Sequence, residues 1–552
     1  MQPMKNHFTS VLPLSKFSPR LKTSVVVLIT AFASIHAQAA EYVRQSVAEF
    51  SKDPAKVAAF KTAVAAMSAN NSKPGMSDDF HTSWEYWANV HGYLGDGPKA
   101  AGKAATFVPA AVKRSCSGAN LTTCTNYYKH LKDSKVPKDG FTDQVWGSCQ
   151  HGTNGFLPWH RMYLHFFERT LRKKSGNPNF ALPYWNYFQE TGKGSTGIAL
   201  PTIFRGTAAG SLYDQWRTPG INENTVAIDA ESGSAAQAFK ATTFSSFYSR
   251  LEGQPHGSMH CGLGSGCTAP DIGLVPFAGW DPAFYTHHAN IDRLWQCWMN
   301  NKAAGKPITL EWAKANLGMT EAWFKTSYVF ADENGKKVTM AIEDLFKPGV
   351  IESRYDVETD CVVEMPKAKS ASQALVSASA PSDAPAVMAV NPMSTNGKVT
   401  TLKGKSMSLS LTPHAGAQLR SAGSAEASAA AKASNVLLIL ENVDIVGEPG
   451  VHYKIYLSHK ASPKKTSYVA TMSYFGKLGD MGHKHEHMDG SKGKIGTLNY
   501  DVTDQLQELG IKDPADIVIK FVPSNLSTKA VVEKTTTGAV TVGNVRLENG
   551  TE

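Results

Sequence analysis

The stretch DPAFYTHHANIDRLWQCWMN, from Asp281 to Asn300, predicts the helix around which the rest of the chain is arranged. Residues spaced by three and four positions lie on one face of a helix, and this spacing joins Phe284, His288, Ile291 and Trp295. The pattern therefore places an imidazole in the middle of an apolar stripe. A single buried histidine with one backbone partner needs no metal, so His288 indicates a metal site only if other histidines join it.

Other histidines have the spacing of metal ligands. In HGSMH, His256 and His260 are four residues apart, and on a helix two such rings lie on the same face about one turn apart. With His288 they make one set of three. A second set lies upstream, on aromatic-rich segments that also predict helices or helix starts: His91, His151 and His160.

The composition of the two sets narrows the choice of metal. They contain imidazoles, without a cysteine pair or an obligatory carboxylate. Such donors favour copper, and fit zinc less well. Three ligands per ion also leave positions open for a small molecule, which a closed structural site would not do.

Four motifs together resemble the two copper-binding regions of the tyrosinase and catechol oxidase family, the polyphenol oxidases: HGTNGFLPWHR, LPYWNY, HGSMH and DPAFYTHHANIDRLW. The resemblance covers about residues 42 to 360. It implies a binuclear (type-3) copper centre that binds dioxygen, the co-substrate, between two copper ions. Carried over position by position, it implies one copper on His91, His151 and His160 and the other on His256, His260 and His288. His287 does not align with a ligand.

The resemblance also implies roles for residues close to these histidines. Glu252 aligns with a glutamate that orients a water and accepts the phenol proton. From its position on the helix alone, Asp292, one turn after His288, is expected to fix a ring nitrogen of a ligand, with a helix-surface acid as the alternative. Gly257 stands where many tyrosinases carry asparagine, which speaks against efficient monophenol hydroxylation. Val275 stands where plant enzymes often carry a bulky phenylalanine over the copper. The smaller valine side chain favours monophenol hydroxylation.

The chain has seven cysteines, an odd number for an exported protein. Cys149 precedes His151 by two residues, and the resemblance to fungal members implies a thioether between them, with a plain buried thiol as the alternative. The remaining six are expected to form two disulfides that close short loops and to leave two cysteines unassigned: Cys116–Cys124 and Cys261–Cys267, then Cys297 and Cys361.

Residues 1–40 predict a cleavable signal peptide, with four cations, a short apolar run and the small-residue sequence Ala37-Gln38-Ala39. The run is too short for a comfortable membrane span. We therefore expect an exported protein, periplasmic or secreted, with no membrane span after cleavage. Removing the four cations lowers the net charge from +9 to +5, which gives no indication of a nucleic-acid partner.

The length of the chain predicts more than one domain. Residues 41–364 are expected to form a mainly α catalytic domain, a four-helix bundle around the dicopper site with long loops. An Ala/Ser/Pro-rich linker follows at 365–396. Short alternating runs in 397–552 predict a small all-β sandwich, which resembles the C-terminal domain that keeps plant polyphenol oxidases latent until it is cut off.

Three smaller features complete these expectations. Arg44 is expected to stack on Tyr355 and tie the first strand to the last, with a plain surface arginine as the alternative. Tyr474-Phe475 is a candidate for the side chain that plugs the site. His483, His485 and His487 could bind copper during loading, or form a solvated turn.

The predicted function is that of a polyphenol oxidase, which hydroxylates monophenols and oxidises ortho-diphenols to ortho-quinones and stays latent until the C-terminal domain is removed. The alternatives are a catechol oxidase with diphenolase activity only and a haemocyanin-like oxygen-binding protein. A zinc hydrolase gives no reason for six imidazoles in two sets. The expected partners are small phenolic substrates and an activating protease, while the sequence leaves the oligomeric state and the physiological phenol open.

Overall fold

The computed structural model describes residues 42–93, 137–189, 197–269, 271–359, 361–363, 391–413, 419, 435–447, 449–477, 492–528 and 536–550. The predicted signal peptide, the Cys116–Cys124 pair and the histidines 483, 485 and 487 lie outside these residues. Buried apolar side chains form two clusters. One belongs to a helical part, described here between residues 42 and 363, and the other to a β-rich part between 391 and 550.

Two long helices form the centre of the helical part, α8 (Phe156–Ser175) and α13 (Ala283–Ala303). The predicted helix from Asp281 to Asn300 is confirmed, and the Asp281 carboxylate accepts the Ala283 N–H at its start. Helix α8 ends with three cations in its last turn and then Gly176 at φ 68°, the left-handed conformation that glycine adopts most easily. Both helices are buried over most of their length.

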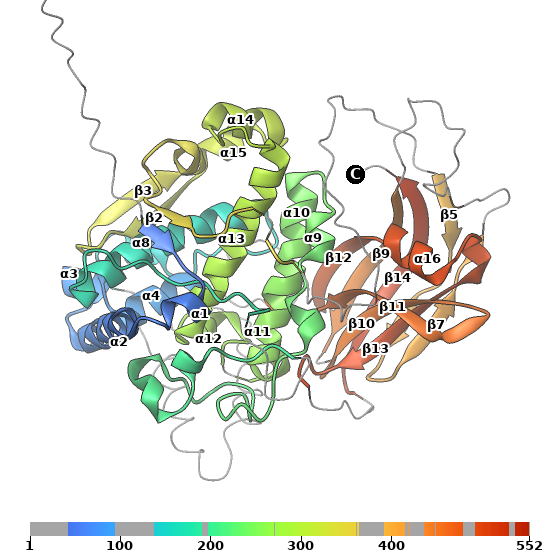
Figure 1. Ribbon diagram of the computed structural model, residues 1–552, viewed down its shortest axis with the longest axis horizontal. Coiled ribbons are helices and arrows are strands. Elements are labelled where there is room, and N and C mark those ends of the chain that lie inside the picture. The colour runs from blue at the N-terminus through green and yellow to red at the C-terminus, as the bar shows by residue number, and fades with distance from the viewer. Residues whose placement is uncertain are drawn as a thin grey trace, which may run out of the picture. The chain divides into compact units, whose positions relative to one another are not determined.

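Shorter elements surround these two helices (Figure 1). The helices are α1 (Val47–Phe50), α2 (Pro54–Ala69), α3 (Asp78–His81), α4 (Trp84–His91), α7 (Thr142–Val145), α9 (Ala236–Phe239), α10 (Phe244–Leu251), α11 (Ser258–Leu263), α12 (Val275–Ala278), α14 (Leu310–Asn316) and α15 (Glu321–Lys325). Single turns are η1 (Asn70–Ser72), η4 (Thr202–Phe204), η5 (Thr207–Leu212), η6 (Ala230–Gly233), η7 (Glu252–Gly257), η8 (Ser265–Cys267) and η9 (Ile342–Phe346). Strands β2 (Ser327–Ala331) and β3 (Lys337–Ala341) form an antiparallel pair.

The first and last strands of the helical part lie side by side. Strand β1 (Tyr42–Arg44) pairs in parallel with β4 (Ser353–Tyr355), and Arg44 is opposite Tyr355. The Arg44 guanidinium donates to the Tyr355 hydroxyl at 2.8 Å and lies 5.4 Å from the centre of its ring. The predicted contact is confirmed, and Arg44 is buried rather than on the surface.

The β-rich part contains two antiparallel sheets that share one core. One has the order β11-β10-β13-β7, and the other has the order β12-β9-β14-β5-β8 with β6 paired to β14. The bounds are β5 (Asn391–Thr395), β6 (Thr400–Leu402), β7 (Met407–Ser410), β8 (Thr412–Pro413), β9 (Asn435–Val446), β10 (His452–His459), β11 (Ser462–Met472), β12 (Lys492–Asp501), β13 (Ile517–Ser524) and β14 (Ala539–Gly550), with helix α16 (Thr503–Leu509) and turn η10 (Pro514–Asp516).

The expected order, a helical core followed by a β-rich part, is confirmed, with two differences in detail. Strand β5 begins at Asn391, inside the range predicted as linker, because it pairs with β14 and β8. The four-helix bundle stays a prediction, since one predicted ligand, His256, comes from the irregular turn η7 rather than from a regular helix. Within the described residues, no helix is both long enough and apolar enough to cross a membrane.

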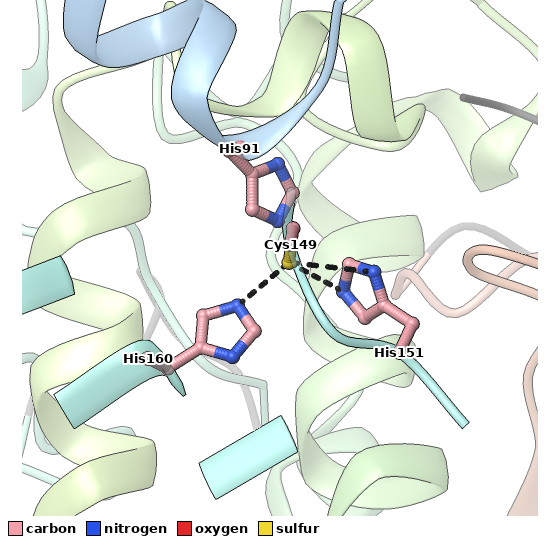
Figure 2. A group of neighbouring side chains, drawn as sticks. All are labelled: His91, Cys149, His151 and His160. Atoms are coloured by element: carbon pink, nitrogen blue, oxygen red, sulfur yellow. Dashed lines mark hydrogen bonds between the residues drawn. The ribbon is translucent and has the colours of Figure 1, made fainter. Parts of the chain in front are cut away.

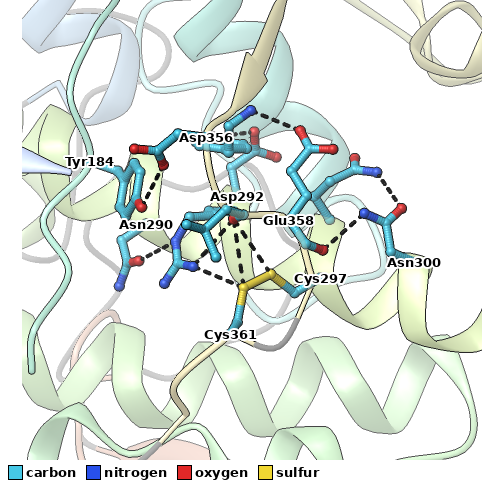
Figure 3. The surroundings of a disulfide bond; sticks show 12 residues. Tyr184, Asn290, Asp292, Cys297, Asn300, Asp356, Glu358 and Cys361 are labelled. Carbon is cyan, nitrogen blue, oxygen red and sulfur yellow. Dashed lines mark hydrogen bonds between the residues drawn. A yellow bond between two sulfur atoms is a disulfide. The ribbon is translucent and has the colours of Figure 1, made fainter. Parts of the chain in front are cut away.

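Two disulfides lie in the described residues. Cys261–Cys267 is confirmed. The two cysteines left unassigned by the sequence form the second, Cys297–Cys361 (Figure 3). It joins α13 to the segment just before residue 364, where Arg293 donates to the Cys361 sulfur at 2.8 Å. Cys149 is free and buried.

Candidate metal centre

The first group of predicted ligands comes from three separate segments. His91 is the last residue of α4, His151 precedes α8, and His160 lies one turn into α8. Figure 2 shows their rings facing one another around Cys149. All four side chains are buried, and their ligand atoms lie within 4.8 Å of one another.

The second group comes from η7, α11 and α13. It contains His256, His260, His287 and His288, again buried and with ligand atoms within 4.8 Å of one another. His256 lies in η7 and His260 in α11, and the break in the backbone, at Gln254, comes before both. Their ring centres are nevertheless 4.7 Å apart, so the predicted pairing of the two rings is preserved.

The two groups adjoin. The His160 ring of the first group stacks on the His288 ring of the second, with centres 4.3 Å apart and planes 8° apart. The Nε2 atoms of His260 and His288 are 3.2 Å apart. The structure therefore brings all six predicted histidines into one buried site with two halves.

Main-chain carbonyls hold the outer nitrogen of four rings. The Nδ1 atoms lie 2.7–3.1 Å from these oxygens, in the pairs His91–Val275, His160–Phe156, His256–Glu252 and His260–Ile272. Such contacts fix the tautomer and leave Nε2 as the ligand atom. The buried Nε2 of His256 has no hydrogen-bond partner among the described residues. A buried polar atom without a partner is costly, and a bound metal ion would satisfy it.

Asp292 does not hold a histidine, and this corrects the expectation. Its carboxylate accepts from Arg161 at 2.6 Å, from the Tyr355 hydroxyl at 2.6 Å and from Arg44 at 3.5 Å. Three donors occupy its oxygens, and none of them is a histidine nitrogen. Because Arg161 follows His160 directly, Asp292 instead fixes α8 against α13.

His287 lies closer to the site than the sequence predicted. Its Nδ1 is 2.6 Å from the Tyr187 hydroxyl, and its ring contacts those of His256 and His260. Only His288 of the two neighbours has ring contacts with the first group among the described residues, to His91 and His160. His288 therefore faces the first group while His287 does not, and this position of His288 fits the predicted assignment.

Burial and the charge of neighbouring rings lower the pKa of the histidines in the second group well below their ordinary value of 6.5. Burial is the larger cause for each ring. The rings therefore stay neutral at pH values where exposed histidines take up protons. Neutral imidazole is the form that binds a metal.

This shift predicts how the stability of the metal-free chain depends on pH. The unfolded rings take up protons near pH 6.5, whereas the folded rings resist. Stability is therefore complete above pH 6.5 and falls as the pH drops below it, by up to about 1.4 kcal/mol per ring and pH unit. Urea unfolding of the metal-free chain between pH 7.5 and 5 should show this steep loss. A flat profile over that range would contradict the electrostatic description of the site.

Glu252 is buried at the edge of both groups. Its carboxylate accepts the N–H of Gly152, next to His151, at 2.7 Å, while its main-chain oxygen contacts His256 Nδ1. Burial raises the pKa of Glu252, although the positive charge of Lys477 and the Gly152 N–H oppose the change. A carboxylate with a raised pKa beside a metal site is suited to accept a proton.

Cys149 lies among the rings of the first group. Its sulfur is 3.6 Å from His151 Nδ1 and 3.3 Å from His160 Nε2. Burial, together with the negative charge of Glu252, raises the pKa of the thiol well above its ordinary value. These contacts are close, and the thioether to His151 stays a prediction.

Residues of the β-rich part cover the second group. The Phe475 ring stacks on His260 with centres 3.8 Å apart and planes 7° apart, and its edge contacts His151 and His256. Phe475 belongs to the hydrophobic cluster of the helical part, unlike its neighbour Tyr474. Of the two candidates for the plug, Phe475 is therefore the one that contacts the histidines.

Gly257 and Val275 lie next to this covering segment. A Cβ atom at Gly257 would come within 2.5 Å of the Ser473 hydroxyl. The side chain of Val275 lies near Gly476, and its main-chain oxygen holds His91. Both predicted specificity positions thus contact the β-rich part as well as the site.

A sequence profile described as "Common central domain of tyrosinase" matches residues 81–217 and 211–301. The chain is 26% identical over 461 residues to the latent form of polyphenol oxidase from Prunus armeniaca, covering 75% of this chain and 67% of that protein. It is 28% identical over 295 residues to the tyrosinase HcTyr1 of Hahella sp. (strain CCB-MM4), covering 48% and 54%. The chain thus spans about two thirds and about half of these two relatives.

Solved structures show the same fold. A latent aurone synthase (polyphenol oxidase) from natural source matches with a TM-score of 0.54 at 18% identity, over 92% of this chain and 89% of that one. Latent apple tyrosinase matches with a TM-score of 0.52 at 19% identity, over 93% and 98%. Both matches extend over the helical and the β-rich part.

Proposed function

Because the chain belongs to the tyrosinase and polyphenol oxidase family of copper oxidoreductases, we propose that it uses dioxygen at two copper ions to hydroxylate monophenols and to oxidise ortho-diphenols to ortho-quinones. The observation that carries the proposal is the pair of adjoining buried histidine groups. In the proposal, His91, His151 and His160 hold one ion, and His256, His260 and His288 hold the other. Copper bound there would supply oxygen activation and accept the substrate electrons.

Glu252 is proposed as the base that accepts the phenol proton. Its raised pKa brings it closer to the working pH, where a general base is most effective. Its carboxylate accepts the N–H of Gly152, beside His151, and its main-chain oxygen contacts His256, so the residue lies next to both groups. Held in this way, Glu252 can receive a proton from a hydroxyl that approaches either half of the site.

The proposal includes both monophenols and ortho-diphenols as substrates, and two residues bear on this range. Val275 is small and would leave room for a phenol ring, whereas Gly257 lacks the asparagine side chain of many tyrosinases. A Cβ atom at Gly257 would meet the Ser473 hydroxyl, so the close approach of this segment is a second reason for glycine at this position. We therefore propose both activities.

The proposal is tested by oxygen uptake and quinone absorbance of the copper-loaded chain, given a monophenol and then its ortho-diphenol, before and after proteolysis in the linker. Quinone from both substrates, rising after cleavage, is the expected result. Quinone from the diphenol alone would show that the chain has only the activity of a catechol oxidase. Reversible oxygen binding without turnover of either, even after cleavage, would overturn the enzyme proposal.

Latency is proposed to depend on Phe475, with an activating protease cutting the linker that precedes β5. The ring stacks on His260, a proposed copper ligand, and so fills the space against that face of the second group. Lys477 adds a positive charge beside Glu252. The domain order predicted from the sequence, with a catalytic domain, a linker and a shielding β-sandwich, is proposed on the same grounds.

Replacing Phe475 by alanine is expected to raise phenol turnover by the uncut chain about tenfold, because an aromatic contact of roughly 1.4 kcal/mol holds the segment in place. Turnover of uncut and cut protein is the measurement. Asn499→Ala, which removes a contact with Arg250 elsewhere on the same interface, should leave the uncut chain latent. If cleavage activates the chain but Phe475→Ala does not, another side chain blocks the site.

Export through residues 1–40 is also proposed, to the periplasm or outside the cell, with no nucleic acid among the partners. The relatives from Prunus armeniaca and Malus domestica are described as chloroplastic, so the destination needs its own test. N-terminal sequencing of the protein from its native source should start near residue 41. A chain that keeps residue 1 would contradict export by cleavage.

A further inference from the structure

The turn η7 carries two residues of the proposed site, Glu252 at its start and His256 near its end. Its backbone departs from helical geometry at Gln254, where φ is −151° and ψ is 127°. Helical hydrogen bonds alone therefore do not determine the shape of the turn at this residue. Side-chain contacts fix it there as well.

The side chain of Gln254 provides these contacts, and it is only 8% exposed. Its amide nitrogen donates to the main-chain oxygen of Glu231 and, at 2.9 Å, to the Tyr468 hydroxyl. Its amide oxygen accepts the N–H of Thr471 at 2.8 Å and lies 3.1 Å from the same hydroxyl. All but the Glu231 contact come from strand β11 of the β-rich part.

A second contact from the same segment supports the turn. The Ser473 hydroxyl donates to the main-chain oxygen of Gly253 at 2.6 Å. Without β11, the buried Gln254 amide would lose its partners on that strand, which costs about 1–3 kcal/mol for a polar group that stays buried. Because Gln254 is two residues from both Glu252 and His256, we expect a displacement of Gln254 to shift both.

We propose that Gln254 is a positioning residue, through which strand β11 fixes the turn that carries His256. The β-rich part then helps to form the second copper group as well as to cover it. This inference rests on the proposed copper function. It predicts that contacts made by Tyr468 determine how firmly the second copper is held.

The test compares two tyrosine variants of the full-length chain. Tyr468→Phe removes the hydroxyl that contacts Gln254 and keeps the ring. Tyr456→Phe is the matched control, because Tyr456 is opposite Tyr468 in the sheet and its hydroxyl contacts the Glu231 carboxylate, whereas Gln254 donates to the Glu231 main-chain oxygen. Metal-free protein is titrated with copper, and bound copper, electron paramagnetic resonance and unfolding temperature are recorded.

For Tyr468→Phe we expect one of the two copper ions to bind roughly 10- to 100-fold more weakly, the effect of losing a group that orients a ligand. The lone copper that remains at intermediate loading gives a resonance signal, which a coupled pair does not. Tyr456→Phe should bind copper like the unchanged chain.

Equal copper affinity in Tyr468→Phe and the unchanged chain would overturn the role of Gln254 and leave the proposed function intact. Equal weakening in both variants would also overturn it, because general loosening of the interface would explain the loss. An unchanged chain that binds no copper would overturn the proposed function itself. If Tyr468→Phe unfolds early, Ser473→Ala provides the same comparison through Gly253.

Discussion

Replacing His288 by alanine is expected to remove one of the two copper ions and to lower phenol turnover by roughly 10³-fold or more. A metal ion in such a site stabilises the developing charge by several kcal/mol, and each 1.36 kcal/mol changes the rate tenfold. His288 has this large expected effect because it is a proposed ligand of the second copper and its ring faces the first group. Its Nε2 faces that of His260, and its ring stacks on His160.

The neighbouring histidine provides the matched control. His287→Ala removes a ring of the same size from the same helix turn and the same group. Its ring is held from the side by Tyr187 and has no ring contact with the first group among the described residues. We therefore expect this variant to keep both copper ions and most of the turnover.

Copper content and turnover are measured together for both variants after linker cleavage. If His287→Ala lost a copper and His288→Ala kept both, the assignment carried over from the family pattern would be wrong. If each lost one copper, both rings would be ligands. Restoring turnover in His288→Ala with free imidazole would show that the ring itself, and not a change in helix packing, is what the site lost.

The sequence predicted those features that depend on spacing along the chain. The helix around His288, the two sets of histidines and the short Cys261–Cys267 loop all depend on residues close together or on a family pattern. The expectation for Arg44 and Tyr355 also came from that pattern, and the parallel pairing of β1 with β4 confirms it. The alternation of short runs predicted the β-rich part.

Other contacts between distant segments could not be predicted from the sequence. No local pattern indicates that Cys297 pairs with Cys361, 64 residues away. Asp292 has the spacing of a residue that could contact His288, but the direction of its side chain depends on where Arg161 and Tyr355 lie. Gln254 carried no signal at all, because its partners come from a strand more than 200 residues later.

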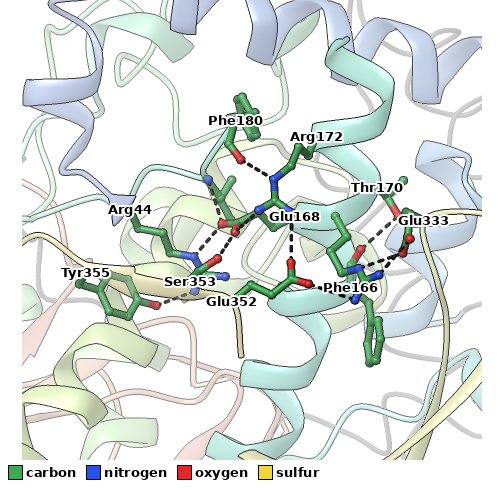
Figure 4. A network of polar contacts seen from close by, with 12 residues as sticks. Arg44, Phe166, Glu168, Thr170, Arg172, Phe180, Glu333, Glu352, Ser353 and Tyr355 are labelled. Carbon is green, nitrogen blue, oxygen red and sulfur yellow. Dashed lines mark hydrogen bonds and ion pairs between the residues drawn. The ribbon is translucent and has the colours of Figure 1, made fainter. Parts of the chain in front are cut away.

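Because the charge of Asp292 is buried, this is the position where replacing a single atom is expected to lower the free energy of unfolding most. Arg44 and Arg161 both donate to its carboxylate, and all three side chains are buried. Burial by itself lowers the pKa of Arg44, but the charges of Glu168, Tyr355 and Asp292 outweigh it and the net direction is upward. Figure 4 shows the Arg44 side of this network, where Glu168 also accepts from Arg172.

Asp292→Asn keeps the shape of the side chain and removes its charge. We expect the free energy of unfolding to fall by roughly 3–5 kcal/mol, because the variant leaves buried arginine charge without compensation. Urea unfolding of the metal-free chain measures the change. Since Arg161 follows His160, the variant should also loosen the first copper group, which copper titration would detect.

Glu333→Gln is the control for this prediction. Glu333 pairs with Arg169 where the two side chains are 23% and 31% exposed, so its loss should cost at most about 1 kcal/mol. Adding Arg161→Met to Asp292→Asn should restore part of the stability, since it removes the uncompensated charge. If Asp292→Asn lowered the free energy of unfolding no more than Glu333→Gln, the network would not be what fixes α8 against α13. The same would follow if Arg161→Met restored no stability to Asp292→Asn.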